Sequence, residues 1–507
     1  MRRRVDVAII GAGFGGLAMA HQLRQEGIGN IVILERDAGV GGTWRANSYP
    51  GAACDVPSHL YSLSFAPNPW WSRTYAGQPE ILHYLEGCYD RLGVRDLVRC
   101  STEIESIVWH DDRRVWQLRD SGGSQLEARI VVSAVGLFHT PAVAELPGLA
   151  DFCGTVFHSA RWRHDHDLRG RRVAVVGTGA SAIQIVPSIA GDVAQLTVFQ
   201  RTPAWIVPRK DEPFTREEQE QFASDRQHAL RLRTELYDQH ERNTSFNTGD
   251  PLAAQLTHYA LGYLEHKVAD PELRASLTPN YPIGCKRILV SSDFYPALHR
   301  SNVELVTDGI EQVLSDGIRA TNGVEHNVDT IVLCTGFRAT EYLRGIGVTG
   351  RHGTDLQRHW SGKARAHHGM SVPGFPNFFL LYGPNTNQGG NSIILILEAQ
   401  ARYVAQAVRI MRERQLSSVE VRPEAMEQYS DQLEEAMTRT VWNAGCDSYF
   451  RTAAGEIVTQ LPHTAGWYCD RIRRFELSEF DCRSMGADEP VRGHADAGDA
   501  SGPVPAP

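Results

Sequence analysis

Two stretches of the chain share one hydrophobic pattern: an apolar run, a glycine-rich turn, a helical stretch and a second apolar run. In the first stretch, VDVAII at 5–10 is followed by the helical pattern LAMAHQLRQEG and then by NIVILE. In the second, VAVV at 173–176 leads through a turn and a helical stretch to QLTVFQR at 195–201. Strand, helix and parallel strand form the repeating unit of a doubly wound sheet. We predict an α/β fold with two Rossmann-type domains.

The first turn has the spacing of a dinucleotide-binding fingerprint. Gly11, Gly13 and Gly16 form GxGxxG between the strand and the helix, and Glu35 ends the next strand, 19 residues beyond Gly16. Glycines at these positions let the backbone approach a pyrophosphate at the helix N-terminus, and the carboxylate can bind a ribose 2′-hydroxyl. This unit is therefore predicted to hold a dinucleotide without a 2′-phosphate.

The second turn repeats the pattern with one change of charge. The residues expected to hold the coenzyme are Gly177, Thr178, Gly179, Ser181 and Ala182. Arg201 stands 19 residues beyond Ala182, where the first unit has its carboxylate. A carboxylate repels a 2′-phosphate, whereas a guanidinium pairs with one. We expect FAD in the first unit and NADPH in the second, with NADPH reducing the flavin.

Composition narrows the class of protein. The 507 residues exceed one ordinary core, and a net charge of −9 gives no electrostatic reason to expect nucleic acid or an anionic membrane as a partner. No apolar run reaches the roughly 18 residues that a membrane helix needs. The start, MRRRVDVAII, resembles a signal peptide, but glycines interrupt its apolar run, so we expect none. Nine scattered cysteines without a CxxC pair are expected to be free thiols in a reducing cytoplasm.

The chain is expected to weave between its domains. Two further apolar strands, IVVSAVG at 130–136 and TIVLCTG at 330–336, end at glycines and would return near the cofactors. The charged stretch TREEQEQFASDRQHALRLRTELYDQHE begins with a capping box, Thr215 and Glu218, and predicts helices. Two interpretations of these helices stay open: they cover the substrate side of the enzyme, or they form a solvated helical hairpin without a function. The expected domain ranges are 1–145 and 376–484 for FAD, 146–211 and 280–375 for NADPH, 212–279 for a helical insertion, and 485–507 for a disordered tail.

Two longer motifs identify a family resemblance. DFCGTVFHSARW contains Phe152, Gly154, His158 and Trp162, which match FxGxxxHxxxW, although Arg163 follows where the family has Pro or Asp. The second motif, GGxWxxxxYPGxxxD, is matched by Gly41, Gly42, Trp44, Tyr49, Pro50, Gly51 and Asp55. Over roughly residues 5–480 the sequence resembles the flavin-dependent monooxygenases of the type I Baeyer–Villiger class.

The resemblance implies an activity and a catalytic pair. NADPH would reduce FAD, O2 would give a C4a-peroxyflavin, and a ketone would become an ester or lactone. By its match in YPIGCKRIL, Arg287 is implied as the catalytic arginine and Asp55 as the carboxylate that holds it; their spacing alone could not pair them. A fixed cation stabilises a peroxide anion and an alkoxide, and an arginine does not lose its proton.

The same resemblance implies further site residues. Lys286 and Thr202 would join Arg201 at the NADPH phosphate. Residues implied at the flavin are Thr43, Trp44, Asp55, Tyr61, Ile104 and Ile393, the last at a helix that Ser392 would cap. Tyr449 matches a position in a mobile loop. His158 is implied to govern domain movement, although without the family an ordinary packed histidine is the simpler interpretation. No metal site is expected.

Three alternative functions compete with this interpretation. A heteroatom oxygenase acting on amines or sulfides does not require the Arg287–Asp55 pair, and the departure at Arg163 keeps it open. A flavin disulfide reductase is discarded because the closest cysteines, Cys88 and Cys100, are 12 residues apart. A non-catalytic NADPH-binding regulator is disfavoured by the intact fingerprints. The identity of the small-molecule substrate, the oligomeric state and the pathway are not encoded in any motif.

Overall fold

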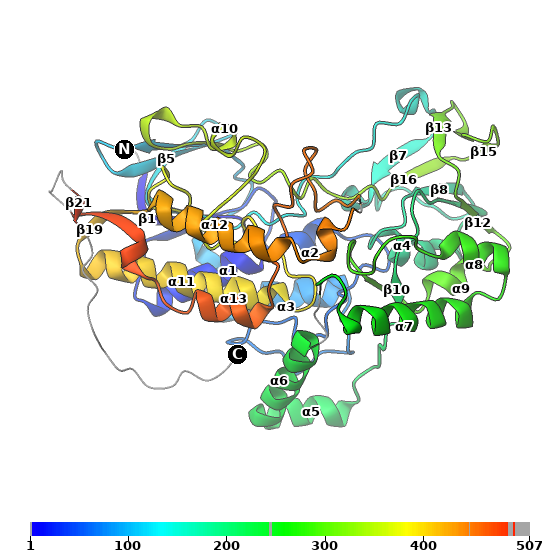
Figure 1. The fold of residues 1–507 in the computed structure, drawn as a ribbon, viewed down its shortest axis with the longest axis horizontal. Helices are drawn as coiled ribbons and strands as arrows, with labels where there is room; N and C mark the ends of the chain where they lie inside the picture. Colours follow the sequence, from blue (N-terminus) through cyan, green and yellow to red (C-terminus); the bar gives the residue numbers. More distant parts are fainter. Residues whose placement is uncertain (1–2, 243–245, 446, 485–489, 492–507) are drawn as a thin grey trace.

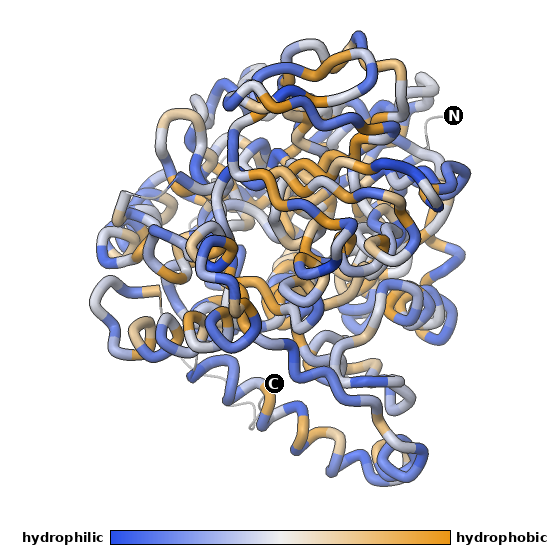
Figure 2. Tube along the Cα trace, turned by 90° about the vertical axis from the view of Figure 1, so that its right-hand side faces the viewer, coloured by the Kyte–Doolittle hydropathy of each residue, from blue (hydrophilic) through white to orange (hydrophobic). Residues whose placement is uncertain are grey.

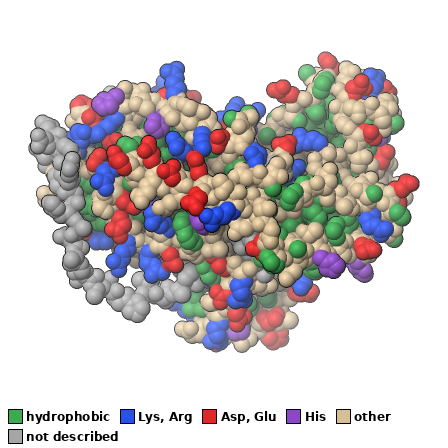
Figure 3. Space-filling view, in the orientation of Figure 1, with side chains coloured by type: hydrophobic (Ala, Val, Ile, Leu, Met, Phe, Trp, Pro, Cys, Tyr) green, Lys and Arg blue, Asp and Glu red, His purple; other side chains and the backbone are tan. Residues whose placement is uncertain are grey.

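Two separate sheets, one for each fingerprint, form the framework of the protein. The computed structural model describes residues 3–242, 246–445, 447–484 and 490–491. In Figure 1 the sheet that contains β1 (Arg3–Ile10) lies on the left and the sheet that contains β8 (Arg172–Val176) on the right. The space-filling outline is indented at its upper edge between these two lobes (Figure 3). The predicted α/β class with two Rossmann-type domains is confirmed.

The first sheet has eight strands in the order β17-β4-β5-β6-β1-β2-β3, with β18 paired to β6. β1 is parallel to β2 and β6, whereas β4, β5 and β6 form an antiparallel meander. The remaining strands are β2 (Ile31–Leu34), β3 (Val98–Arg99), β4 (Ile104–His110), β5 (Val115–Asp120), β6 (Gln125–Ser133), β17 (Gly347–Thr349) and β18 (Phe378–Leu380).

The second sheet has five strands, all parallel, in the order β12-β9-β8-β16-β7. They are β7 (Thr155–His158), β8, β9 (Gln195–Phe199), β12 (Val303–Val306) and β16 (Thr330–Leu333). Smaller sheets join β10 (Ile206–Val207) with β11 (Leu289–Val290), β13 (Ile310–Val313) with β14 (Gly317–Ala320) and β15 (Glu325–Asn327), and β19 (Leu416–Val421) with β20 (Phe480–Ser484) and β21 (Pro490–Val491).

Helices cover the faces of both sheets. α1 (Phe14–Gln25) and α11 (Ile393–Glu413) pack together in the core beneath the first sheet, and α4 (Ala182–Ile189) packs against the second. The others are α2 (Thr43–Ala46), α3 (Gln78–Arg91), α5 (Arg216–Ser224), α6 (Arg226–Arg242), α7 (Pro251–Lys267), α8 (Pro271–Leu277), α9 (Phe294–Leu298), α10 (Leu356–Trp360), α12 (Pro423–Met437) and α13 (Ala465–Arg471). Figure 2 shows hydrophobic segments gathered in the interior and hydrophilic ones along the outer helices. None of the helices in the described part of the chain has the length and apolar character of a membrane span.

The helical stretch between β10 and β11 forms as the sequence predicts. α5 to α8 follow β10, and α5 begins with the predicted capping box: Thr215 Oγ1 accepts from Glu218 N at 3.2 Å, and Glu218 Oε2 accepts from Thr215 N at 2.7 Å. α6 is anchored by Arg233, whose buried Nη1 donates to backbone carbonyls at His59 and Ser62. The insertion is therefore bound to the domain of the first sheet through this helix.

One predicted boundary differs from the structure. The sequence predicts that 280–375 belongs to the second domain, but β17 pairs parallel with β4 of the first sheet. Val348, Leu356 and Trp360 are buried in the core of that sheet, against Ile107 and Trp116. Because these side chains belong to the core of the first sheet, the chain crosses between the domains in the segment directly after β16.

Two further expectations need correction. Pro490–Val491, inside the tail expected to be disordered, pairs antiparallel with β20 as β21, and the rest of 485–507 lies outside the described residues. Cys285 is disulfide-bonded, against the expectation of free thiols throughout, whereas Cys54, Cys88 and five others are free. Spacing along the chain could not show this bond, since a disulfide depends on how the fold places the two sulfurs.

Candidate active site

The first glycine turn brings the backbone of β1 close to the start of α1. Gly11 has φ 103°, and a Cβ there would lie 2.6 Å from Ala134 O. A Cβ on Gly16 would lie 2.0 Å from Gly11 O. Gly13 is the N-cap of α1 and has no side chain to cap it, so the first N–H groups of the helix face a cavity instead. This turn fits a pyrophosphate.

Glu35 is buried at the end of β2, beside the same turn. Its carboxylate accepts from Ala12 N at 2.6 Å and from Asp37 N at 2.8 Å. Burial raises the pKa of Glu35, against the effect of these two N–H groups. The hydrogen bonds fix the carboxylate at the cavity wall, where its remaining lone pairs can accept from a ribose hydroxyl.

The GGxW motif packs directly against the glycine turn and extends the cavity wall from there. Gly42 has φ 52°, and its backbone lies against Gly13. A Cβ on Gly42 would lie 3.0 Å from Gly13 Cα. Trp44, on α2, donates from Nε1 to Tyr61 Oη at 3.1 Å. The predicted flavin residues that line this cavity are Thr43, Trp44, Asp55, Tyr61, Ile104 and Ile393.

The cap predicted for α11 is confirmed. Ser392 Oγ accepts from Ile394 N at 3.3 Å, and the loop before it returns Tyr382 and Asn387 to the cavity wall. Tyr382 Oη donates to Asn387 Oδ1 at 2.5 Å. The positive end of the α11 dipole therefore lies next to a cavity that can hold an anionic ring.

The second glycine turn opens into the same cavity. Gly177 has φ 108°, and a Cβ there would lie 2.6 Å from Cys334 O, whereas a Cβ on Gly179 would meet nothing within 4 Å. From this unit the cavity is lined by Gly177, Thr178, Gly179, Ser181, Arg201 and Thr202, but not by Ala182. The space beside Gly179 is thus open to a ligand.

Two cations line the cavity near this turn. Arg201 is exposed, and Lys286 Nζ lies 4.9 Å from the centre of the Tyr281 ring. Burial, and then repulsion by Arg201, lowers the pKa of Lys286. Neighbouring cations that repel each other favour an anion between them, and a phosphate supplies two charges and several acceptors.

Arg287 and Asp55 meet across 232 residues of chain. Arg287 Nε donates to Asp55 Oδ2 at 3.0 Å, and Nη2 donates to Oδ1 at 2.8 Å and to Oδ2 at 2.6 Å. The charge of Asp55 raises the pKa of Arg287, against the effect of burial. Among the described residues Nη1 has no hydrogen-bond partner, and both side chains line the cavity. The pair presents a fixed cation with an unused donor.

The cavity joins both units in one space of about 1120 Å³. Glu35 and Ile104 lie on its wall at the first glycine turn, Arg201 at the second, and Arg287 belongs to the same wall. At both turns the first glycine lets the backbone pass close to a neighbouring strand end, since a Cβ at Gly11 or Gly177 would collide with Ala134 O or Cys334 O. The geometry therefore fits two nucleotides that share one reaction space.

The FxGxxxHxxxW motif does not line the cavity and is more than a connector. β7, which includes His158, is the edge strand of the second sheet. Phe152 is buried in that sheet's core, and a Cβ on Gly154 would lie 2.4 Å from Asp329 O. Trp162 packs edge-on against Phe157 at 5.1 Å. These contacts explain three motif positions by packing.

His158 is the motif residue that contacts side chains and backbone of the cavity wall. Its Nδ1 accepts from Ala160 N at 3.1 Å, and its ring packs edge-on against Phe337 at 5.8 Å. Burial lowers the pKa of His158, opposed by the backbone of Gly336. Gly336 and Phe337 line the cavity, so His158 supports the turn after β16. Arg163, the departure from the motif, is exposed and pairs with Asp165 at 2.6 Å.

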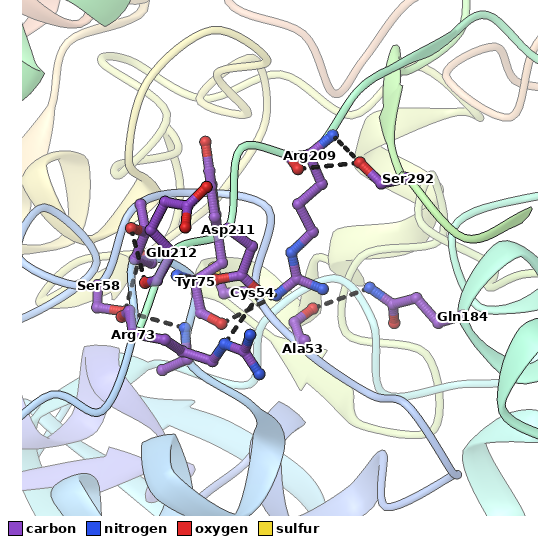
Figure 4. A network of polar contacts seen from close by, with 12 residues as sticks. Ala53, Cys54, Ser58, Arg73, Tyr75, Gln184, Arg209, Asp211, Glu212 and Ser292 are labelled. Carbon is purple, nitrogen blue, oxygen red and sulfur yellow. Dashed lines mark hydrogen bonds and ion pairs between the residues drawn. The ribbon is translucent and has the colours of Figure 1, made fainter. Parts of the chain in front are cut away.

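A second cavity, of about 660 Å³, lies behind the site where the two domains meet. Figure 4 shows its network: Arg209 donates to Tyr75 O at 2.9 Å, and Asp211 pairs with Arg209 at 3.4 Å and Arg73 at 3.1 Å. Gln184 Nε2, from α4, donates to Ala53 O at 3.0 Å. These contacts tie the segment after β10 and the helix of the second fingerprint to the first domain.

Some contacts of the site were not predictable from motifs. Tyr49 is a motif residue, but its partner Gln184, which accepts from Tyr49 Oη at 3.0 Å, carries no signal in the sequence. Asp447 and Tyr281 also line the cavity without having been singled out. Tyr281 stands in the YPIGCKRIL stretch, and that stretch was the signal that could have identified it.

Known proteins resemble this chain over nearly all of its length. A family model described as pyridine nucleotide-disulphide oxidoreductase matches residues 8–231. A Baeyer–Villiger monooxygenase of Pseudomonas aeruginosa is 44% identical over 482 residues, covering 94% of this chain and 91% of that protein. The FAD-binding monooxygenase ktnD of Aspergillus niger is 36% identical over 505 residues, covering 96% and 83%.

A solved structure gives the same result in three dimensions. The crystal structure of cyclohexanone monooxygenase from Rhodococcus sp. Phi1 bound to NADP+ matches with a TM-score of 0.86 and 28% identity, covering 96% of this chain and all of that one.

Proposed function

Because the chain belongs to the Baeyer–Villiger monooxygenases, we propose that Arg287, held by Asp55, is its catalytic arginine. The protein is an FAD-dependent monooxygenase that uses NADPH and O2 to insert oxygen next to a ketone carbonyl, giving an ester or lactone. The heteroatom oxygenase is not favoured, since the relatives are named for the Baeyer–Villiger reaction. Bound FAD, once reduced, supplies the chemistry that activates oxygen.

The observation that carries the proposal is the bidentate pair at the cavity wall. Asp55 occupies Nε and Nη2 of Arg287 and leaves Nη1 without a partner among the described residues. A planar guanidinium held on one edge points its other donor in a defined direction. Negative charge that develops on oxygen during the reaction would be stabilised there, and one such donor can contribute about 2.7–4 kcal/mol.

We assign nucleotide binding to the residues around the two turns. The adenosine and pyrophosphate of FAD are supported by Gly11, Gly13, Gly16 and Glu35. The rest of FAD is surrounded by Thr43, Trp44, Tyr61, Ile104 and Ile393. Their common place on the wall supports this assignment, except for Gly16, which acts by packing. The 2′-phosphate of NADPH is bound by Arg201, Thr202 and Lys286. Its pyrophosphate is bound at the start of α4 by Gly177, Thr178, Gly179 and Ser181, and Ala182 packs behind this turn.

We assign His158 a positioning role. It ends the edge strand β7 and contacts the turn at Gly336 and Phe337, so its contacts support the wall near the second nucleotide. A shift of the second domain would be transmitted to that wall through this side chain.

A product panel tests the proposed substrate class. The purified enzyme, supplied with NADPH and O2, is given cyclic ketones, open-chain ketones, sulfides and amines, and the products are identified by mass. Esters or lactones formed from ketones are expected. Sulfoxides or N-oxides formed without any ester would contradict the proposal.

A further inference from the structure

Three potential metal-ligating atoms meet in the first domain, away from the nucleotide cavity. His367, His368 and Glu479 each place one such atom within 4.8 Å of the other two. His367 and His368 follow α10, and Glu479 stands directly before β20, 112 residues beyond His367. None of the three lines either described cavity. The cluster therefore needs an explanation other than the monooxygenase reaction.

The backbone turns so that two consecutive imidazoles lie side by side. His368 has φ 51°, and its ring centre lies 3.9 Å from that of His367. The turn is closed by His367 N donating to Ser371 O at 2.8 Å and by Ser371 N donating to His367 O at 3.1 Å. Neighbouring side chains in extended backbone point to opposite sides, so this left-handed residue is what brings the rings together.

Several buried polar atoms around the rings lack partners. Among the described residues, neither ring nitrogen of His368 makes a hydrogen bond, nor does Nδ1 of His367. The hydroxyls of Tyr403 and Tyr429 lack one too, although all four residues are at most 2% exposed. The Tyr429 ring lies 4.9 Å from that of His368. Buried polar groups are nearly always paired, so each such atom points to an ion or an ordered water.

Glu479 gives the cluster its charge. Its Oε2 lies 3.0 Å from Nε2 of His367, and its side chain is 24% exposed while that of His367 is 2% exposed. The carboxylate thus stands at the rim of a buried pair of imidazoles, where an ion could enter. Two imidazole nitrogens and one carboxylate oxygen are ligands that Zn²⁺ accepts.

We propose that His367, His368 and Glu479 bind a Zn²⁺ ion that fastens the turn after α10 to the C-terminal segment before β20. A fourth position is left for a water molecule. Bonds of about 2.0–2.2 Å require the three ligand atoms to draw together from their present spacing by side-chain adjustment. The ion is structural and takes no part in oxygen insertion.

Metal content of the FAD-loaded enzyme tests this site. The wild type, Glu479→Gln and His368→Leu are equilibrated with Zn²⁺, dialysed, and measured for zinc and FAD per chain. About one zinc per chain is expected in the wild type, and at least a tenfold weaker affinity in both variants. His258→Ala, which removes an exposed histidine on α7, is the matched control and should keep its zinc.

A thermal measurement covers the case in which a variant folds poorly. Zinc should raise the Tm of the wild type and of His258→Ala but not that of Glu479→Gln, whose change is isosteric and lies at the rim. FAD content reports folding in each sample. A wild type that takes up no zinc, as expected if ordered water fills the cluster, would overturn the proposal. Zinc retained equally by both ligand variants would also overturn it.

Discussion

At the scale of single residues, the site is organised by charges that the fold holds in fixed places. Asp55 orients Arg287 by three hydrogen bonds, and Lys286 lies close enough to Arg201 for their repulsion to lower its pKa. The first arrangement directs a donor into the cavity and the second attracts an anion. Each can be tested by removing one charge.

Coenzyme selectivity should depend on Arg201. Arg201→Ala is expected to raise the KM for NADPH roughly tenfold or more, because a charge-assisted hydrogen bond contributes about 1.5–3 kcal/mol. The KM for NADH should hardly change, since NADH lacks the 2′-phosphate. Steady-state oxidation of both coenzymes measures the effect.

The matched control for this change is Arg169→Ala, an exposed arginine of the same domain that pairs with Asp167. It should leave both KM values unaltered. Equal efficiency of the wild type with NADPH and NADH would contradict the assignment of Arg201.

At the scale of elements, the strand–glycine–helix turns were predictable because their signal is local. A strand, a glycine in the left-handed region and a helix start lie within about a dozen residues, and Gly11 and Gly177 adopt this conformation. The FxGxxxHxxxW motif was less predictable: the sequence showed a connector, whereas β7 is an edge strand whose partner β16 lies far along the chain. Local patterns cannot show such a pairing.

The two fingerprints should respond differently to added methyl groups. Gly179→Ala has free space in the protein, so folding and FAD content should stay normal. Its methyl group would instead meet the NADPH pyrophosphate and raise the KM for NADPH about tenfold, equivalent to about 1.4 kcal/mol. Gly16→Ala overlaps Gly11 O and should give protein without bound flavin. Normal NADPH kinetics in Gly179→Ala would contradict the assignment of the NADPH pyrophosphate to the second glycine turn.

Two variants of the FxGxxxHxxxW motif should distinguish the positioning role of His158 from the packing role of Phe152. His158→Ala is expected to slow turnover while FAD remains bound and the Tm changes little, because the ring supports the cavity wall. Phe152→Ala removes a core side chain and should cost about 3–5 kcal/mol of folding free energy. Turnover and thermal melting of both variants decide the matter. An unfolded His158→Ala enzyme would show that His158 is an ordinary packed core histidine and has no positioning role.

At the scale of the whole molecule, the class of fold followed from the two units, but the contacts between distant segments did not. The Arg287–Asp55 pair and the His367–Glu479 pair join residues 232 and 112 positions apart, and nothing in their spacing connects them. The return of β17 to the first sheet was missed for the same reason, since three residues carry too little pattern. Family resemblance supplied the first pair; the second had no such guide.

The attachment of the helical insertion to the first domain should depend on one buried arginine, Arg233. Arg233→Ala removes the hydrogen bonds that α6 makes to His59 O and Ser62 O, and we expect a loss of about 1.5–3 kcal/mol in folding free energy. Arg231→Ala, on the same helix but exposed and paired only loosely with Asp225, is the control. Denaturant unfolding measures both, and equal stability of the two variants would show that Arg233 does not anchor the insertion.

The central claim is that Arg287 serves oxygen insertion rather than flavin reduction. The most direct measurement is the amount of ester formed per NADPH consumed by Arg287→Ala, with hydrogen peroxide quantified in the same reaction and flavin reduction followed by rapid mixing. The fingerprints remain intact in this variant, so NADPH should still reduce the flavin, while ester falls to nearly nothing and peroxide takes its place. Arg287→Lys should recover little, because an ammonium lacks the planar fork that Asp55 holds. An Arg287→Ala enzyme that forms ester at close to the wild-type ratio would contradict the account.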